Sequence, residues 1–96
     1  MTELRALIDA LDAELVAQLA LRARCIDRAV QIKRGVGLPA RIPSRVEDVV
    51  AKVRNRAAAE GLDPDLAEAL WRPLIDWSIA REERTLGPSD GSPGGE

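Results

Sequence analysis

The apolar residues in the first third of the chain recur with the period of an α-helix. They fall every three or four positions, no Gly or Pro interrupts them before Gly35, and Thr2 can cap the start. A helix over 2–34 is a rod of roughly 50 Å. Two shorter helices cannot cover so long a stripe, so we expect an oligomer, most simply a twofold dimer. The stripe comprises Leu4, Ile8, Leu11, Leu15, Leu19, Ile26 and Ala29.

Turn residues divide the rest of the chain into two shorter helices. Residues 35–43, GVGLPARIP, hold two Gly and two Pro and predict a loop. Ser44, with Glu47 three positions later, has the spacing of a capping box, which predicts the start of a second helix. That helix should stop at Gly61. The predicted fold class is therefore all-α, with three helices per chain and a very long first helix.

The third helix is followed by a segment of different composition. Asp63 precedes a proline, an arrangement that caps and starts a helix, and Pro73 inside the helix is expected to kink it. From residue 87 onward, GPSDGSPGGE has nothing to bury. We therefore predict a helical domain over 1–86 and a disordered tail over 87–96.

Composition narrows the classes of function. The net charge of −2 gives no reason to expect nucleic acid or an anionic membrane surface as a partner. Cys25 is the single cysteine and there is no His, so neither an internal disulfide nor a Cys/His metal site is expected. The start of the chain is amphipathic rather than a signal peptide, and no apolar run approaches the ~20 residues of a membrane span. We expect a cytoplasmic protein.

Two cations interrupt the apolar stripe of the first helix. From Arg22 to Lys33 is eleven residues, about 1100° of rotation, so both lie on one line, ~16 Å apart. This separation suits the two ends of a small polyanion, which a guanidinium and an ammonium can both bind. On periodicity alone, ion pairs across a dimer interface are the commoner explanation of such cations.

The order of the polar residues resembles the all-helical class of chorismate mutases, over residues 3 to about 86. The opening LRALIDALDAELVAQLALRA is similar to the first-helix signature of that family, in which Arg5 and Arg22 match two arginines that bind the substrate carboxylates. Lys33 matches the lysine that donates to the ether oxygen of the breaking bond. Arg45, in RIPSRVEDVV, matches a further arginine of the active site at the start of the second helix.

The third helix extends the resemblance. Ser78, in IDWSIAREE, matches a serine that contacts a carboxylate. Glu82, four residues later, falls where the family carries Gln or Glu as a second donor to the ether oxygen. A Ser and a Glu on one helix face are ordinary when taken alone. The specific signal is that six residues match in the family's order and spacing.

The resemblance implies an isomerase of aromatic amino acid biosynthesis in the shikimate pathway that converts chorismate to prephenate without a cofactor or metal. It also implies an intertwined homodimer in which Arg5 of one chain completes the pocket of the other. Within one chain, Arg5 and Arg22 are ~25 Å apart along the rod and about 100° apart around it, too far for one small ligand. Glu82 can donate only when protonated, so activity is expected to fall as the pH rises through its titration.

The residue after Arg45 leaves alternatives open. The best-known bacterial mutases place an acid there to accept the ring hydroxyl, whereas this chain has Val46. Valine occurs at this position in the related isochorismate-pyruvate lyases, which give salicylate and pyruvate, but Glu82 favours the mutase. A further alternative is a non-catalytic helical dimerisation module. It would need acids opposite Arg22 and Lys33, since a buried unpaired charge costs several kcal/mol, and the stripe offers few.

Overall fold

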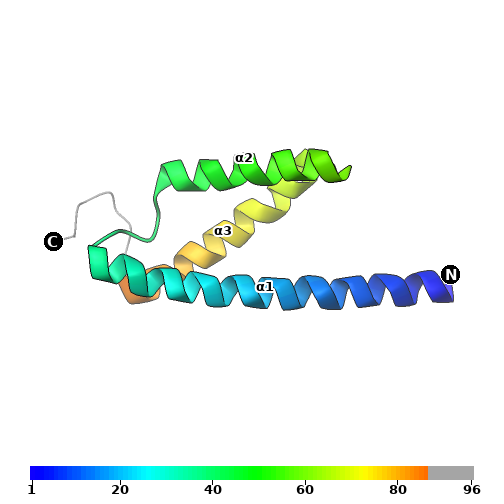
Figure 1. Cartoon of the computed structure of the whole chain (residues 1–96), viewed down its shortest axis with the longest axis horizontal. Helices are drawn as coiled ribbons and strands as arrows, with labels where there is room; N and C mark the ends of the chain where they lie inside the picture. Colours follow the sequence, from blue (N-terminus) through cyan, green and yellow to red (C-terminus); the bar gives the residue numbers. More distant parts are fainter. Residues whose placement is uncertain (87–96) are drawn as a thin grey trace.

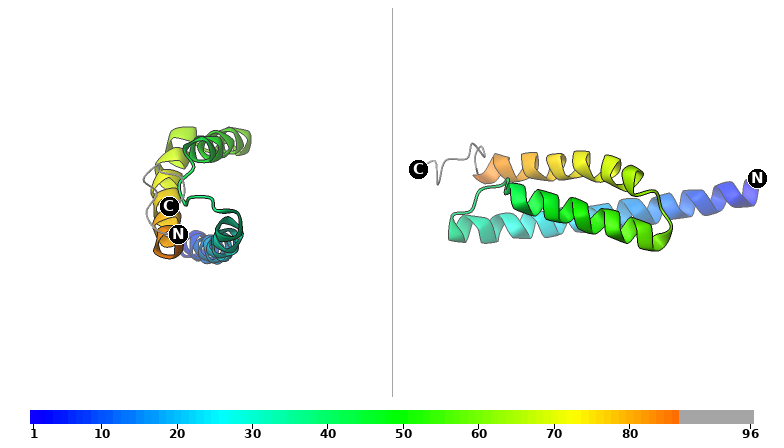
Figure 2. Two further views of the ribbon diagram at one scale, coloured as in Figure 1. Left: turned by 90° about the vertical axis from the view of Figure 1, so that its left-hand side faces the viewer. Right: turned by 90° about the horizontal axis from the view of Figure 1, so that it is seen from above.

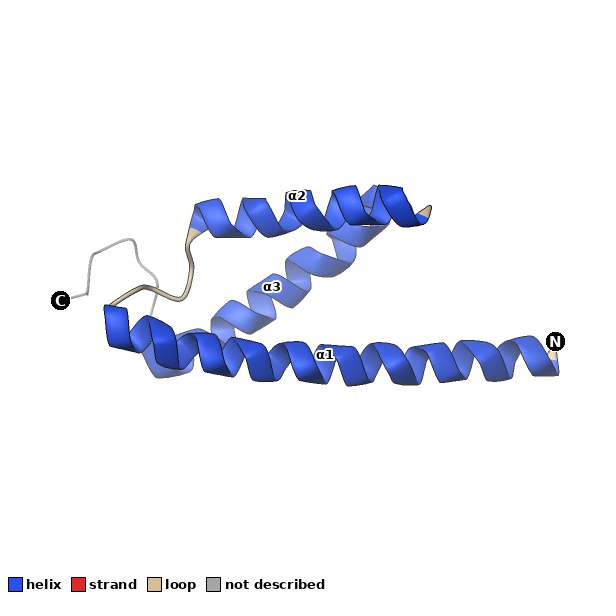
Figure 3. Cartoon of the chain, in the orientation of Figure 1, coloured by secondary structure: helices blue, strands red, loops and turns tan. Residues whose placement is uncertain are grey.

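The structure is a computed structural model that describes residues 1–86, and its elements are three α-helices (Figures 1 and 3). Helix α1 spans Thr2–Val36, α2 spans Pro43–Glu60 and α3 spans Pro64–Leu86. The all-α class and the very long first helix are thus confirmed. The predicted tail, 87–96, lies outside the described residues.

The ends of α1 differ from the prediction. The N-cap is Met1 rather than Thr2, and no side chain caps it. The helix continues through Gly35 to Val36 and is capped by Gly37, whose φ of 75° is left-handed and whose N–H donates to the Lys33 carbonyl. Gly35 therefore has helical backbone. The helix stops at the glycine that actually adopts positive φ, which is Gly37.

The predicted capping box at the start of α2 is wrong. The helix begins two residues earlier, with Ile42 as N-cap and Pro43 at its first position, and no side chain caps it. The proline suits this place because its fixed φ is helical and its missing N–H would have had no helical partner. The predicted stop at Gly61 is confirmed by its left-handed φ of 77°.

The start of α3 follows the prediction. The Asp63 Oδ1 atom accepts a hydrogen bond from the Asp65 backbone N–H at 2.9 Å, which satisfies one of the free donors at the helix end. Pro73 lies inside α3 with its side chain exposed. Helix α3 thus runs from Pro64 to Leu86 as one element.

The helices are held together through α3. In the described chain, α3 packs against both α1 and α2, whereas α1 and α2 do not pack against each other. Seen end-on, the three helices form an open C (Figure 2, left). The core lies around the junction of α2 and α3 and the loop before α2, with Val46, Val49, Trp71 and Leu86 at its edge; its buried residues are Ala40, Val50, Ile75 and Ile79.

The N-terminal end of α1 extends beyond the other helices (Figure 1). Every residue from 1 to 21 is exposed. The molecule is 57 Å long with a radius of gyration of 16.3 Å, against ~13 Å for a compact chain of this size. The dimer remains a prediction, and it rests on this uncovered apolar surface of α1. Side chains 42–66% exposed on it are Leu4, Leu7, Ile8, Leu11, Leu15, Val16 and Leu19.

None of the described helices combines the length and the hydropathy that a bilayer span requires.

Candidate active site

A cavity of about 200 Å³ lies among the C-terminal half of α1, the start of α2 and the second half of α3. The structure brings five of the six predicted site residues to its wall. They are Arg22, Lys33, Arg45, Ser78 and Glu82. The remainder of the wall is apolar and consists of Ile26, Ala29, Ala40, Ile42, Val46, Val49, Ile75 and Ile79.

Lys33 and Glu82 form an ion pair across the cavity. The Lys33 Nζ atom lies 2.7 Å from Glu82 Oε2 and donates a second hydrogen bond to the Ala40 carbonyl at 2.9 Å. The exposed fraction is 19% for the lysine side chain and 5% for the glutamate. A carboxylate this deeply buried is costly unless it is paired. The two predicted donors to one ligand atom therefore contact each other.

The Ala40 carbonyl is the part of the site that sequence reasoning missed. It belongs to the loop between α1 and α2 and holds the ammonium group in place. A backbone carbonyl can come from any residue type, so no sequence signal marks it.

Arg22 has a hydroxyl rather than a carboxylate as its partner. Its Nη1 donates to Ser78 Oγ at 3.1 Å, and Ser78 Oγ donates in turn to the Leu74 carbonyl at 2.9 Å. Burial of the guanidinium, and next the positive charge of Arg45, lower the pKa of Arg22 below its ordinary value. Both effects disfavour the charged form, and a bound anion would offset both.

Arg45 stands at the rim of the cavity. Its side chain is 63% exposed and pairs with Asp48 three residues later, Nη1 to Oδ2 at 2.9 Å. An exposed pair of this kind contributes at most about 1 kcal/mol, so it is readily exchanged for a ligand carboxylate. Val46, the next residue, is half-buried and lines the cavity.

Arg5 is the predicted site residue that does not reach the cavity. It lies in the exposed first turns of α1, 17 residues before Arg22, or ~25 Å along the helix. This agrees with the expectation that one chain cannot bring both arginines to one ligand.

The chemistry of the site follows from its charges. Three cations and one carboxyl group face a small cavity with apolar walls, an arrangement that suits an organic dianion. A preorganised ammonium in an apolar site can also stabilise negative charge that develops during a reaction. Among residues 1–86, no three His, Cys, Asp or Glu side chains are grouped so that they could hold a metal ion.

Comparison with known proteins identifies a family. The family model described as chorismate mutase type II matches residues 4–83. The T-protein of Enterobacter agglomerans is 34% identical over 82 residues, which are 85% of this chain and 22% of the relative. The T-protein of Haemophilus influenzae is 31% identical over 84 residues, 88% of this chain and 22% of the relative. The chain thus spans about a fifth of the length of these relatives. No solved structure matches it significantly.

Proposed function

The chain belongs to the chorismate mutase type II family, and from this premise we propose that it catalyses the rearrangement of chorismate to prephenate. The reaction is a concerted isomerisation with no covalent intermediate. An enzyme can accelerate it by holding the folded conformer of the substrate and by stabilising charge in the transition state.

The composition of the cavity is the observation that carries the proposal. Chorismate has two carboxylates, a ring hydroxyl and an ether oxygen in a small carbon framework. The cavity offers Arg22, Lys33 and Arg45 as cations, with Ile75, Ile79 and other apolar side chains around them. Charge and size are therefore complementary to this substrate.

Arg22 and Arg45 would bind and orient the carboxylates. Arg22 is already held by Ser78, which lies 3% exposed beneath it. A guanidinium donates two parallel hydrogen bonds to a carboxylate, and this restricts rotation of the bound group. The arrangement favours the conformer in which the enolpyruvyl arm lies over the ring, a contribution from positioning.

Lys33 would stabilise the negative charge that builds on the ether oxygen as its bond breaks. The Ala40 carbonyl fixes the ammonium, so little reorganisation is needed during the reaction. Glu82 would be the second donor, in its protonated form. Glu82 Oε2 accepts a hydrogen bond from Lys33, so substrate would insert between the two groups.

A second copy of the chain would complete the site with Arg5. The uncovered apolar face of α1 supports a dimer, and the distance of Arg5 from the cavity of its own chain supports its use in the cavity of another. In such a dimer, two antiparallel α1 helices would cover each other's apolar stripes while each delivers its first arginine.

The alternative substrate is isochorismate. Val46 lines the cavity directly after Arg45, so no acid is present at this position to accept the ring hydroxyl of chorismate. An isochorismate-pyruvate lyase would give salicylate and pyruvate from the same cationic site.

The non-catalytic dimerisation module is less well supported. It would require acidic partners for the cations of the stripe, and Arg22 has no carboxylate partner among residues 1–86. Lys33 does have one, but that partner is buried in the cavity rather than on the exposed face of α1.

The test is turnover of chorismate and of isochorismate by the purified protein at pH 5, 6, 7 and 8, with the products identified. Prephenate from chorismate supports the mutase, while salicylate and pyruvate at a much higher kcat/KM establish the lyase. Arg22→Ala should lower kcat/KM by at least about 100-fold. Arg56→Ala is the matched control, because Arg56 pairs with Glu60 on the exposed side of α2. Inertness of the wild type toward both substrates would refute the proposal.

A further inference from the structure

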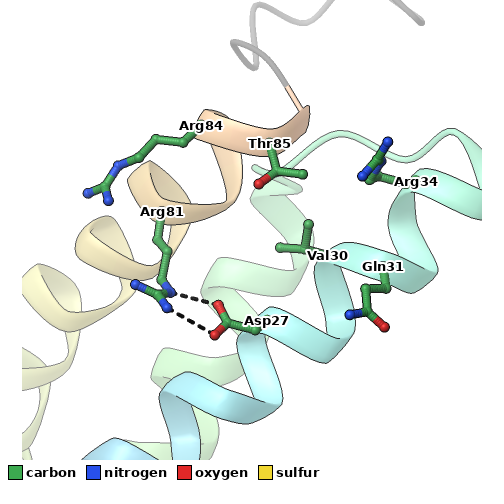
Figure 4. A pocket seen from close by; sticks show the side chains of 7 residues that line it. All are labelled: Asp27, Val30, Gln31, Arg34, Arg81, Arg84 and Thr85. Carbon is green, nitrogen blue, oxygen red and sulfur yellow. Dashed lines mark hydrogen bonds and ion pairs between the residues drawn. The ribbon is translucent and has the colours of Figure 1, made fainter.

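An ion pair joins α1 to α3 at a position between the two contacts that these helices make in the candidate active site, Arg22 with Ser78 and Lys33 with Glu82. The carboxylate of Asp27 accepts hydrogen bonds from Arg81 Nε at 2.6 Å and Nη2 at 2.9 Å (Figure 4). Asp27 follows Arg22 by five residues and precedes Lys33 by six, and Arg81 directly precedes Glu82. The Arg81 guanidinium also lies 5.6 Å from the ring centroid of Trp77, which helps to fix its position.

The pair faces a different cavity from the active site. Asp27 and Arg81 line a second pocket of about 370 Å³ together with Arg34, Arg84 and Thr85 (Figure 4). On both α1 and α3, the residues of this pocket are about a third of a turn away from those of the active site. A substrate bound beside Lys33 would therefore not touch the pair, which cannot act as a catalytic group.

Two further hydrogen bonds between α1 and α3 belong to the site itself. Arg22 binds Ser78 and Lys33 binds Glu82. The Lys33–Glu82 contact must be exchanged for contacts with the substrate. Helix α1 does not pack against α2 in the described chain. When substrate is bound, the distance between Lys33 on α1 and Glu82 on α3 therefore depends on the other contacts between these two helices.

We propose that Asp27 and Arg81 are positioning residues that hold α1 at the spacing from α3 at which Lys33 and Glu82 both reach the substrate. The inference rests on the proposed function. A two-pronged pair suits this role because its parallel hydrogen bonds define both a distance and an orientation.

The charges of the pair persist across the working range of pH. Hydrogen bonds from Arg81 are the main cause that lowers the pKa of Asp27, and the same bonds raise the pKa of Arg81. The Asp27 side chain is 45% exposed, and exposed pairs contribute little to stability. Loss of the pair should therefore lower the unfolding temperature only slightly and appear mainly in catalysis.

Asp27→Asn tests the proposal, with Glu47→Gln as the matched control. Glu47 forms a similar two-pronged pair with Arg72, at 3.1 and 3.2 Å, but joins α2 to α3. We expect Asp27→Asn to lower kcat by about 10- to 100-fold, since displacements near 1 Å have effects of this size. KM should change by less than about threefold, because the loss falls on the transition state. Glu47→Gln should keep the wild-type kcat.

Asp27→Glu provides the conservative rescue. It keeps the carboxylate and should retain kcat within about threefold of the wild type. A wild-type kcat for Asp27→Asn, or a loss no greater than that of Glu47→Gln, would overturn the proposal. So would a loss confined to KM.

Amide hydrogen exchange on the unliganded protein separates this inference from the proposed function. In Asp27→Asn, residues 22–33 should exchange faster than in the wild type and in Glu47→Gln, because α1 is held less tightly. If the wild type is inert but this difference appears, the proposed function fails and the spacing role stands. If exchange is unchanged, the spacing role is refuted whatever the activity.

Discussion

Replacing both members of the Lys33–Glu82 pair should remove activity but leave stability almost unchanged. The two charges lie 2.7 Å apart at the wall of the cavity. Such a pair gains Coulomb energy but loses hydration, so apolar residues of similar size often serve stability equally well. The double variant Lys33→Met/Glu82→Leu tests whether the pair serves catalysis rather than stability.

The structure sets the magnitudes. Lys33→Met alone leaves the Glu82 carboxylate 5% exposed and without its ammonium partner, which costs ~3–5 kcal/mol. In the double variant the carboxylate is gone. The gain of ~1–4 kcal/mol from replacing the ion pair then opposes ~1–3 kcal/mol for the Ala40 carbonyl that loses its donor. The net change should lie between a loss of ~2 and a gain of ~3 kcal/mol.

The assays are urea unfolding and thermal unfolding at pH 7 and one fixed protomer concentration, since an oligomer's stability depends on concentration. Chorismate turnover is measured on the same samples. Lys33→Met should lower the thermal midpoint by roughly 12 °C or more, at ~4–8 °C per kcal/mol. The double variant should recover most of this loss and still lose at least about 100-fold in activity.

The control is the exposed pair Arg56–Glu60, which has the same 2.7 Å separation. Changing both of its members to Gln should alter the free energy of unfolding by less than ~1 kcal/mol. A double variant at Lys33 and Glu82 that is no more stable than Lys33→Met would refute the reasoning. The pair would then be a structural contact.

Four further outcomes are expected. Glu82→Gln should flatten the profile of kcat/KM between pH 5 and 8, because a carboxamide donates at every pH; a flat wild-type profile would contradict the role of Glu82 as a protonated donor. Leu11→Lys, on the uncovered face of α1, should shift the mass measured by light scattering from dimer to monomer and reduce activity. Pro73→Ala should raise the free energy of unfolding by about 1 kcal/mol or more with kcat retained, since an interior proline removes a helix hydrogen bond. Arginine hydrogen bonds lower the pKa of Asp27 and Glu47. Their contribution is present above the unfolded-state pKa near 4, so the thermal midpoint should hold from pH 8 to 5 and fall below about pH 4.

Local rules predicted the helices but not all of their ends. Gly61 and Asp63 stop and start helices as expected, whereas Gly37 replaces Gly35 as the cap of α1 and Pro43 displaces Ser44 from the start of α2. Neighbouring candidates for a cap differ by only ~1 kcal/mol. The surrounding loop therefore decides between them.

Within the site, periodicity alone placed Arg22 and Lys33 on one line, because rotation per residue is constant in a helix. The family order added Arg45, Ser78 and Glu82, and the structure brings all five to one cavity. Arg5 lies apart, as the length of α1 requires.

The sequence by itself determined the helical class, the very long α1 and the residues that share each helix face. These properties depend on contacts between residues three or four positions apart. Only the tertiary structure decided that Lys33 meets Glu82 and that Asp27 meets Arg81, pairs separated by 49 and 54 residues. Such pairings depend on how α1 lies against α3, on the axial register and rotation of two packed helices. No periodicity within either helix contains that information, because packing is set by the side chains of both helices together.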